Sequence, residues 1–106
     1  MNTFIFAALL AGSSFTVTPQ YLEGEWYEPG SGAECGNEFT WKYLPNQRIV
    51  IDEIPEPYRI VRNEVHYMGI DSPTYDVIKP VDRNHMRVKM QNGDWFDLYR
   101  CPGKSG

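Results

Sequence analysis

The sequence predicts an all-β domain, a small antiparallel up-and-down barrel of about eight strands. Apolar and polar residues alternate over short runs, which is the period of a strand with one buried face. Turn residues separate these runs about every eight to twelve positions, and no run beyond the N-terminal stretch has helical spacing. An antiparallel meander of this many strands can close on itself and so remove its exposed edges.

The N-terminal stretch differs from the rest, and we expect residues 1–18 to be a signal peptide. All 10 Lys and Arg and all 14 Asp and Glu lie from Glu23 onward. Residues 4–11 form an apolar run that has the length of a secretory signal core and is too short to span a bilayer. The sequence therefore predicts export to the periplasm or medium, cleavage within residues 13–20, and a single barrel domain over residues 19–106. The alternative is that the apolar run is an element of the domain.

The expected strands follow one another with short turns and leave no room for crossover helices. In order, they cover residues 22–28, 38–43, 48–54, 58–61, 64–70, 74–79, 85–90 and 94–100. Because proline cannot donate a backbone hydrogen bond, Pro55 and Pro57 are expected to end the third strand. Asn92-Gly93 is a strong hairpin signal and joins the last two strands.

The alternation assigns most large apolar side chains to a shared interior. Those expected to point inward are Leu22, Trp26, Phe39, Trp41, Tyr43, Ile49, Ile51, Ile60, Val65, Tyr67, Tyr75, Val77, Met86, Val88, Met90, Phe96 and Leu98. An eight-stranded barrel is just wide enough to be filled by side chains or to hold one small ligand. So many rings in a short barrel favour a filled interior over a ligand pocket.

The two cysteines, Cys35 and Cys101, are expected to form one disulfide in an oxidising compartment. Closing a loop of this length would stabilise the fold by about 4 kcal/mol in the chain-entropy description. The alternative, two free thiols, applies if the chain stays in the cytosol. Neither cysteine belongs to a Cys-x-x-Cys pair, so redox chemistry and structural zinc are not expected.

The net charge of −4 is unevenly distributed. From Glu23 to Glu56 there are eight carboxylates and two basic residues, whereas from Pro57 onward six acids face eight bases. An acidic half disfavours nucleic acid as a partner and is compatible with a basic protein. A solvated acidic surface is the simpler interpretation.

Residues at the two ends of the expected meander resemble a known superfamily. Gly24 and Trp26 on the first strand, with Arg100 on the last, resemble the calycins, which include lipocalins, fatty-acid-binding proteins and avidins. The resemblance implies that Trp26 closes one end of the barrel and that Arg100 packs over its ring, a contact typically worth about 0.5–2 kcal/mol.

A second resemblance covers the N-terminal third of the chain. Leu22, Gly24 and Trp26, followed by Cys35, are similar to the small periplasmic inhibitors of bacterial metalloproteases. Those inhibitors are exported, disulfide-bonded, eight-stranded barrels. The resemblance implies that an extended N-terminal segment, here residues 16–21, would contact the protease.

No group of residues has the pattern of a catalytic or metal site. His66 and His85 fall on separate strands and have neither triad nor metal-ligand spacing, so no catalytic residue, metal or cofactor is expected. Aromatic residues of the outer face are more informative, because exposed rings beside charges are typical of binding surfaces. The expected interaction surface consists of Tyr27, Trp95 and Tyr99, next to Glu23 and Glu25.

These observations favour an exported, monomeric, non-enzymatic binding module that recognises another macromolecule through its surface. One form of this function is inhibition of a secreted hydrolase. The alternative is a lipocalin-like carrier of a small apolar ligand. Neither a nucleic-acid partner nor a membrane span is expected.

Overall fold

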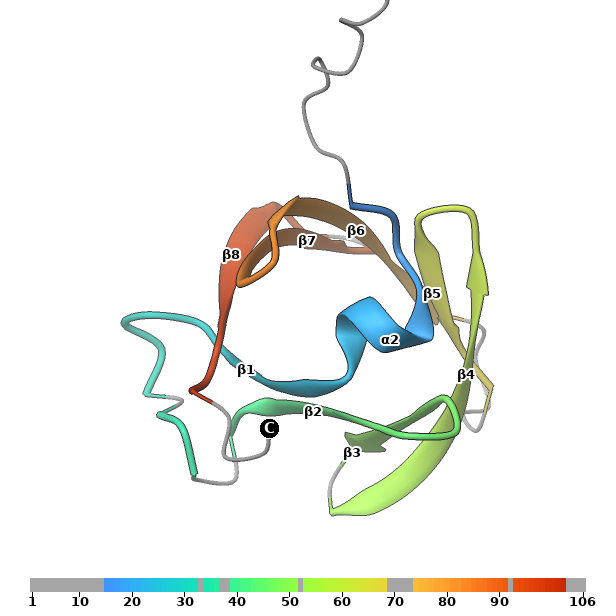
Figure 1. The fold of residues 1–106 in the computed structure, drawn as a ribbon, viewed down its shortest axis with the longest axis horizontal. Coiled ribbons are helices and arrows are strands. Elements are labelled where there is room, and N and C mark those ends of the chain that lie inside the picture. Colours follow the sequence, from blue (N-terminus) through green and yellow to red (C-terminus); the bar gives the residue numbers. More distant parts are fainter. Residues whose placement is uncertain are drawn as a thin grey trace, which may run out of the picture.

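The computed structural model describes residues 15–32, 34–36, 39–51, 53–68, 74–91 and 93–102. Eight antiparallel strands form a closed barrel in which each pairs with its neighbours in sequence and β1 pairs with β8 (Figure 1). The strands are β1 Gly24–Tyr27, β2 Trp41–Leu44, β3 Arg48–Ile51, β4 Ile54–Val61, β5 Glu64–Tyr67, β6 Thr74–Asp82, β7 His85–Met90 and β8 Trp95–Arg100. The predicted fold class, an up-and-down barrel, is confirmed.

The prediction that Pro55 and Pro57 end a strand is wrong, because both lie inside β4. The Tyr58 backbone N–H donates to the Gln47 carbonyl on the β3 side of β4, at 3.1 Å. The nitrogens of the two prolines therefore face the opposite side. On that side, β5 begins to pair with β4 only at Tyr58, which faces Tyr67. Within the described residues, the two missing N–H donors therefore lie on a part of β4 that is not paired with β5.

A short helix, α2, spans Pro19–Leu22, in a region where no helix is predicted. The Thr18 side chain accepts a hydrogen bond from the Tyr21 backbone N–H at 3.0 Å, and Pro19 occupies the first turn. Both features favour a helix start. Leu22 therefore belongs to this helix rather than to the first strand. Figure 1 shows α2 inside the ring of strands, where Tyr21 and Leu22 are buried.

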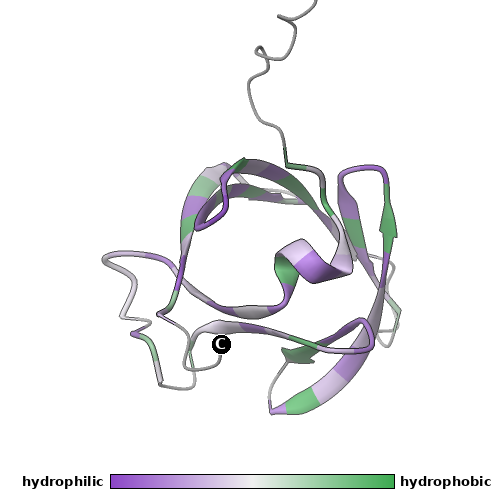
Figure 2. Cartoon of the chain, in the orientation of Figure 1, coloured by the Kyte–Doolittle hydropathy of each residue, from purple (hydrophilic) through white to green (hydrophobic). Residues whose placement is uncertain are grey.

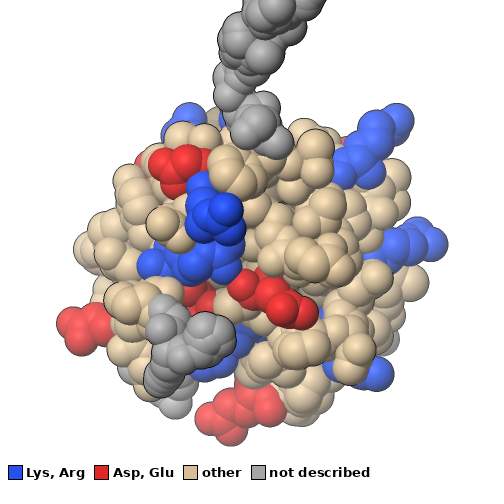
Figure 3. Space-filling model, in the orientation of Figure 1, with Lys and Arg blue, Asp and Glu red and all other residues tan. Residues whose placement is uncertain are grey.

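The core lies inside the barrel and consists mainly of the residues that alternation assigns there. Hydrophobic and hydrophilic residues alternate along the strands in Figure 2. Side chains cover the end of the barrel seen in Figure 3, where acidic and basic residues are interspersed. The buried hydrophobic residues are Tyr21, Leu22, Trp26, Tyr43, Ile49, Tyr58, Val65, Ile78, Met86, Val88, Leu98 and Cys101.

Four inward assignments are wrong, and the Ile51 side chain lies outside the described residues. Met90, the last residue of β7, is 47% exposed. Phe39 precedes β2 and is 63% exposed. In β6 the alternation is inverted, because Asp76 and Ile78 are the buried residues and Tyr75 and Val77 face outward. Asp76 tolerates the interior because it accepts a hydrogen bond from Tyr67.

Residues 15–18, which the sequence assigns to the leader, contact the barrel. Phe15 and Val17 pack against the core, with the Phe15 ring 5.8 Å from that of Tyr21. Thr18 caps α2. Residues 1–14 lie outside the described residues. Among the residues that are described, no helix has the length and hydrophobicity needed to cross a membrane.

Candidate functional site

Trp26 and Arg100 close the end of the barrel that holds α2. Trp26 is fully buried and its indole N–H donates to the Leu22 carbonyl at 2.9 Å. The Arg100 guanidinium carbon lies 4.3 Å from the centre of the Trp26 ring, which is the contact that the resemblance to the calycins implies. Arg100 also donates to the backbone carbonyls of Tyr21 and Glu23, at 2.7 Å each, and of Arg83, at 3.1 Å. This end is therefore a structural closure in which the guanidinium joins α2, β8 and the β6–β7 turn.

Gly24 is required by the same closure. Its φ of +129° is a conformation that side-chain-bearing residues rarely adopt. A Cβ atom at this position would lie 2.9 Å from Arg100 Nη1. Gly24, Trp26 and Arg100 therefore act as one structural unit.

The second fixed point is the long loop between β1 and β2, which the Cys35–Cys101 disulfide joins to the end of β8. The Glu25 carboxylate holds this loop from β1. It accepts hydrogen bonds from the Thr40 hydroxyl at 2.6 Å and the Gly36 backbone N–H at 2.9 Å. Partial burial acts to raise the pKa of Glu25, but these bonds, with the charge of Lys42, outweigh it and lower the pKa. Glu25 therefore acts within the fold.

Glu23 follows α2 at the closed end of the barrel. It is the C-cap of α2, and its backbone carbonyl accepts a hydrogen bond from Arg100. Burial and, secondarily, the charge of Glu23 raise the pKa of Tyr58 on β4 to about 12.

Tyr27 and Tyr99 do lie together on the outer face. They face each other across the β1–β8 pair, with ring centroids 6.2 Å apart. The Tyr99 ring also stacks on His85 at 4.3 Å. His85 Nε2 lies 2.8 Å from Asp97 Oδ1, and this hydrogen bond lowers the pKa of Asp97. The two tyrosines are therefore held against β7 and β8 by a chain of side-chain contacts.

Trp95 lies about 13 Å along β8 from Tyr99, at the ordinary rise of a strand, and is 37% exposed. The Arg87 guanidinium carbon lies 5.7 Å from the Trp95 ring, and Arg87 Nε is 3.3 Å from Asp97 Oδ1. Lys79 Nζ is 5.9 Å from the same ring. We call the resulting line of side chains the outer strip. It comprises Tyr27, Tyr99, His85, Asp97, Arg87, Trp95 and Lys79.

The basic members of the strip and Asp97 were not part of the predicted interaction surface. The Asn92-Gly93 turn does not give the register of these residues, because a two-residue hairpin there would pair Met90 with Trp95, whereas the structure pairs Lys89 with Trp95. In the observed register His85 pairs with Tyr99, and Arg87 with Asp97. Alternation then places these pairs on the outer face.

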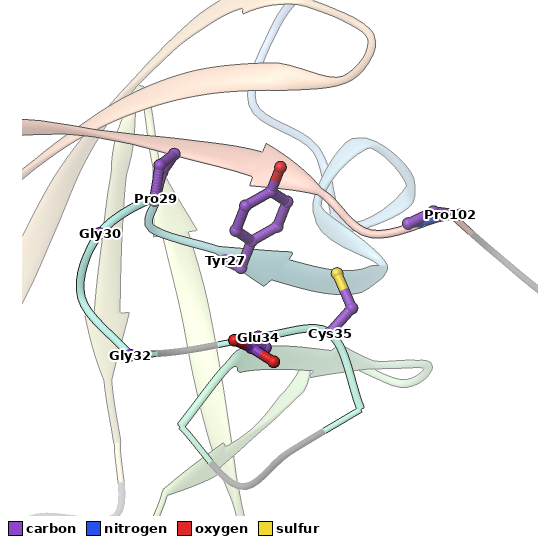
Figure 4. Close-up of a pocket in the computed structure, with 7 residues that line it drawn as sticks. All are labelled: Tyr27, Pro29, Gly30, Gly32, Glu34, Cys35 and Pro102. Atoms are coloured by element: carbon purple, nitrogen blue, oxygen red, sulfur yellow. The ribbon is translucent and has the colours of Figure 1, made fainter.

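A hollow of about 420 Å³ lies beside Tyr27, at one end of the outer strip (Figure 4). Figure 4 shows the loop that follows β1 curving round Tyr27 and returning past Cys35. The lining residues are Tyr27, Pro29, Gly30, Gly32, Glu34, Cys35 and Pro102. Glu34 is the only charged residue among them. Sequence reasoning missed this hollow, because it depends on how the disulfide places the loop.

The barrel interior contains a polar cluster that was also missed. The Tyr67 hydroxyl donates to the buried Asp76 carboxylate, and burial raises the pKa of Asp76. The rings of Tyr43 and Tyr58 meet edge to face at 5.6 Å. Tyr43 is close enough to Tyr67 to affect its pKa. The buried hydroxyl of Tyr58 has no hydrogen-bond partner among the described residues.

The histidines occupy ordinary surface positions. His66 lies 2.9 Å from Glu64 Oε1 and stacks on Tyr75 at 5.0 Å, whereas His85 belongs to the outer strip. Within the described ranges, no group of three or more His, Cys, Asp or Glu side chains is placed to hold a metal ion. No family model, curated protein or solved structure matches the chain.

Proposed function

We propose that this protein is an exported, non-enzymatic, monomeric binding module that recognises another macromolecule through the outer strip. The observation that carries the proposal is the placement of Trp95, an exposed indole on β8 whose ring is contacted by the cationic groups of Arg87 and Lys79. Aromatic and arginine side chains are enriched at protein interfaces, and rings fixed before binding lose little conformational entropy. Inhibition of a secreted hydrolase is one form that this recognition would take.

Two structural features support the finer parts of the proposal. The Trp26 ring under Arg100 is the closure that a calycin-like barrel would have. The Cys35–Cys101 disulfide is compatible with an oxidising, extracytoplasmic compartment.

A capture experiment tests the proposal. The mature protein, immobilised, is exposed to periplasmic extract and culture medium of the source organism, and retained proteins are quantified by mass spectrometry. We expect one specific partner that is retained by the unaltered protein and by Ile54→Ala, a control that truncates an exposed apolar residue on β4. Trp95→Ala should lower retention about tenfold or more, as truncation of a central interface residue does. Equal retention by Trp95→Ala, or no specific partner, would contradict the proposal.

The inhibitor form has its own measurement. If the captured partner is a hydrolase, its activity is assayed with increasing amounts of the unaltered protein and of Trp95→Ala. Inhibition by the first and not by the second is expected. Binding without inhibition would agree with recognition of a partner and would contradict an inhibitory function.

Export also implies a processing site, which we place before Phe15. Phe15 and Val17 pack against the core and Thr18 caps α2, so a cut after Thr18 would remove contacts that the fold uses. Intact-mass measurement of the exported protein tests this placement. A mature N-terminus beyond Thr18 would show that these contacts are dispensable.

The interior polar cluster favours a second candidate, a carrier of a small, mainly apolar ligand. A ligand with one polar group would satisfy the buried Tyr58 hydroxyl, which has no partner among the described residues. Native mass spectrometry of protein purified from its source tests this candidate. A bound small molecule, released by Tyr58→Phe, is the expected result for a carrier, and a ligand-free mass would exclude the carrier function.

A further inference from the structure

We infer that the hollow beside the disulfide accepts a lysine or arginine side chain of the protein partner. The inference rests on the proposed function, since it names the chemistry of the partner at one end of the outer strip. Three observations support it. The described lining of the hollow is negatively charged, the shape of the hollow is fixed before binding, and acidic or apolar side chains would bind in it less favourably.

The described lining of the hollow carries a negative charge. Among the described residues that line it, Glu34 is exposed and is the only charged one, whereas the others are Tyr27, two prolines, two glycines and Cys35. The aromatic ring supplies a second feature that attracts cations, because the face of a tyrosine ring carries negative electrostatic potential. A carboxylate and a ring in one hollow suit an ammonium or guanidinium group.

The shape of the hollow is set by contacts that do not involve a partner. At one end of the loop, the Ser31 backbone N–H and hydroxyl both contact the Glu28 carbonyl, at 3.2 and 2.7 Å. At the other end, the disulfide and the hydrogen bond from Gly36 to Glu25 fix the chain. The hollow is therefore formed before binding, which reduces the entropy lost on association.

The rim between these fixed ends is open. Gly30 and Gly32 have φ values of +81° and +90°, and no heavy atom lies within 4 Å of where their Cβ atoms would be. A partner chain can therefore approach the loop backbone without displacing side chains. Side chains here would both strain the loop and narrow the entrance.

Other occupants fit less well. An acidic side chain would be repelled by Glu34, and an apolar side chain would remove water from the carboxylate without replacing its hydrogen bonds. A lysine or arginine places its aliphatic part against Tyr27, Pro29 and Pro102 and its charge near Glu34.

The test uses N-acetyl-arginine N-methylamide as the probe and N-acetyl-citrulline N-methylamide as its neutral counterpart. Amide chemical shifts of the ¹⁵N-labelled mature protein are followed during titration with each compound. Shifts centred on Gly30, Gly32 and Glu34 are expected with the arginine compound and not with the citrulline compound. Glu34→Gln should remove this response, whereas Glu53→Gln, which alters an exposed acid in the β3–β4 turn, should not. Equal responses to the two compounds, or shifts unaffected by Glu34→Gln, would overturn the inference.

The captured partner separates this inference from the proposed function. If both are correct, Glu34→Gln weakens partner binding about fivefold, the size expected for an exposed ion pair, while Trp95→Ala weakens it further. Binding that depends on Trp95 but not on Glu34 would refute the inference alone. Failure to capture any partner, with an intact arginine response, would refute the proposed function alone.

Discussion

Replacement of Arg100 tests the physical basis of the barrel closure. Its guanidinium makes three hydrogen bonds to backbone carbonyls and lies 4.3 Å from the Trp26 ring centre. Two of the three bonds are solvent-exposed, so we assign about 0.5–1 kcal/mol to each bond and about 1 kcal/mol to the ring contact. Arg100→Met should therefore lower the free energy of unfolding by about 2–4 kcal/mol.

The decisive comparison is with Arg100→Lys, which keeps the charge but not the planar, forked donor geometry. Because lysine cannot reach three separate carbonyls while stacking on Trp26, we expect Arg100→Lys to lose most of the same stability. Urea unfolding followed by far-ultraviolet circular dichroism measures both variants, and Arg59→Met, an exposed arginine on β4, is the control. At about 4–8 °C per kcal/mol for a domain of this size, Tm should fall by about 8–32 °C. Stability of Arg100→Lys within about 0.5 kcal/mol of the unaltered protein would refute the reasoning, since the typical effect of a surface change is no larger.

Three further predictions concern the same fold. Gly24→Ala should lower the free energy of unfolding by about 1–3 kcal/mol, because a φ of +129° is strained for alanine and the new Cβ would meet Arg100 Nη1. A smaller loss in urea unfolding would show that Arg100 and the backbone at position 24 can move apart. The double variant Cys35→Ser, Cys101→Ser removes a disulfide whose cysteines are separated by 66 positions, and it should lower the free energy of unfolding by about 4 kcal/mol. If adding a reductant leaves the Tm of the unaltered protein unchanged, this prediction is wrong. Burial raises the pKa of Asp76 in the folded protein, so its contribution to stability falls as pH rises above the unfolded value of about 4. Asp76→Asn should remove that decline and raise the free energy of unfolding at pH 7 above that of the unaltered protein. If the free energy of unfolding of both proteins changes equally with pH, this prediction is wrong.

The site was only partly predictable from the sequence. Alternation along β8 was enough to place Trp95 and Tyr99 on the outer face, because every second residue of a strand shares a face. It did not show that Glu25 would be engaged by Thr40 and Gly36, since those contacts cross from β1 to a loop that follows it. The hollow around Glu34 likewise depends on a long-range disulfide.

The sequence by itself determined the barrel and its strand order. These follow from period-two alternation and short turns, which act between residues close in the chain or on neighbouring strands. The tertiary structure decided which face of β6 is buried. The run around Asp76 has apolar residues on both faces, and only the Tyr67 hydroxyl across the β5–β6 pair makes a buried carboxylate acceptable. The tertiary structure also decided that Leu22 ends a helix. The open end of a barrel must be covered by apolar side chains, and the helix that begins at Thr18 and Pro19 places Leu22 there.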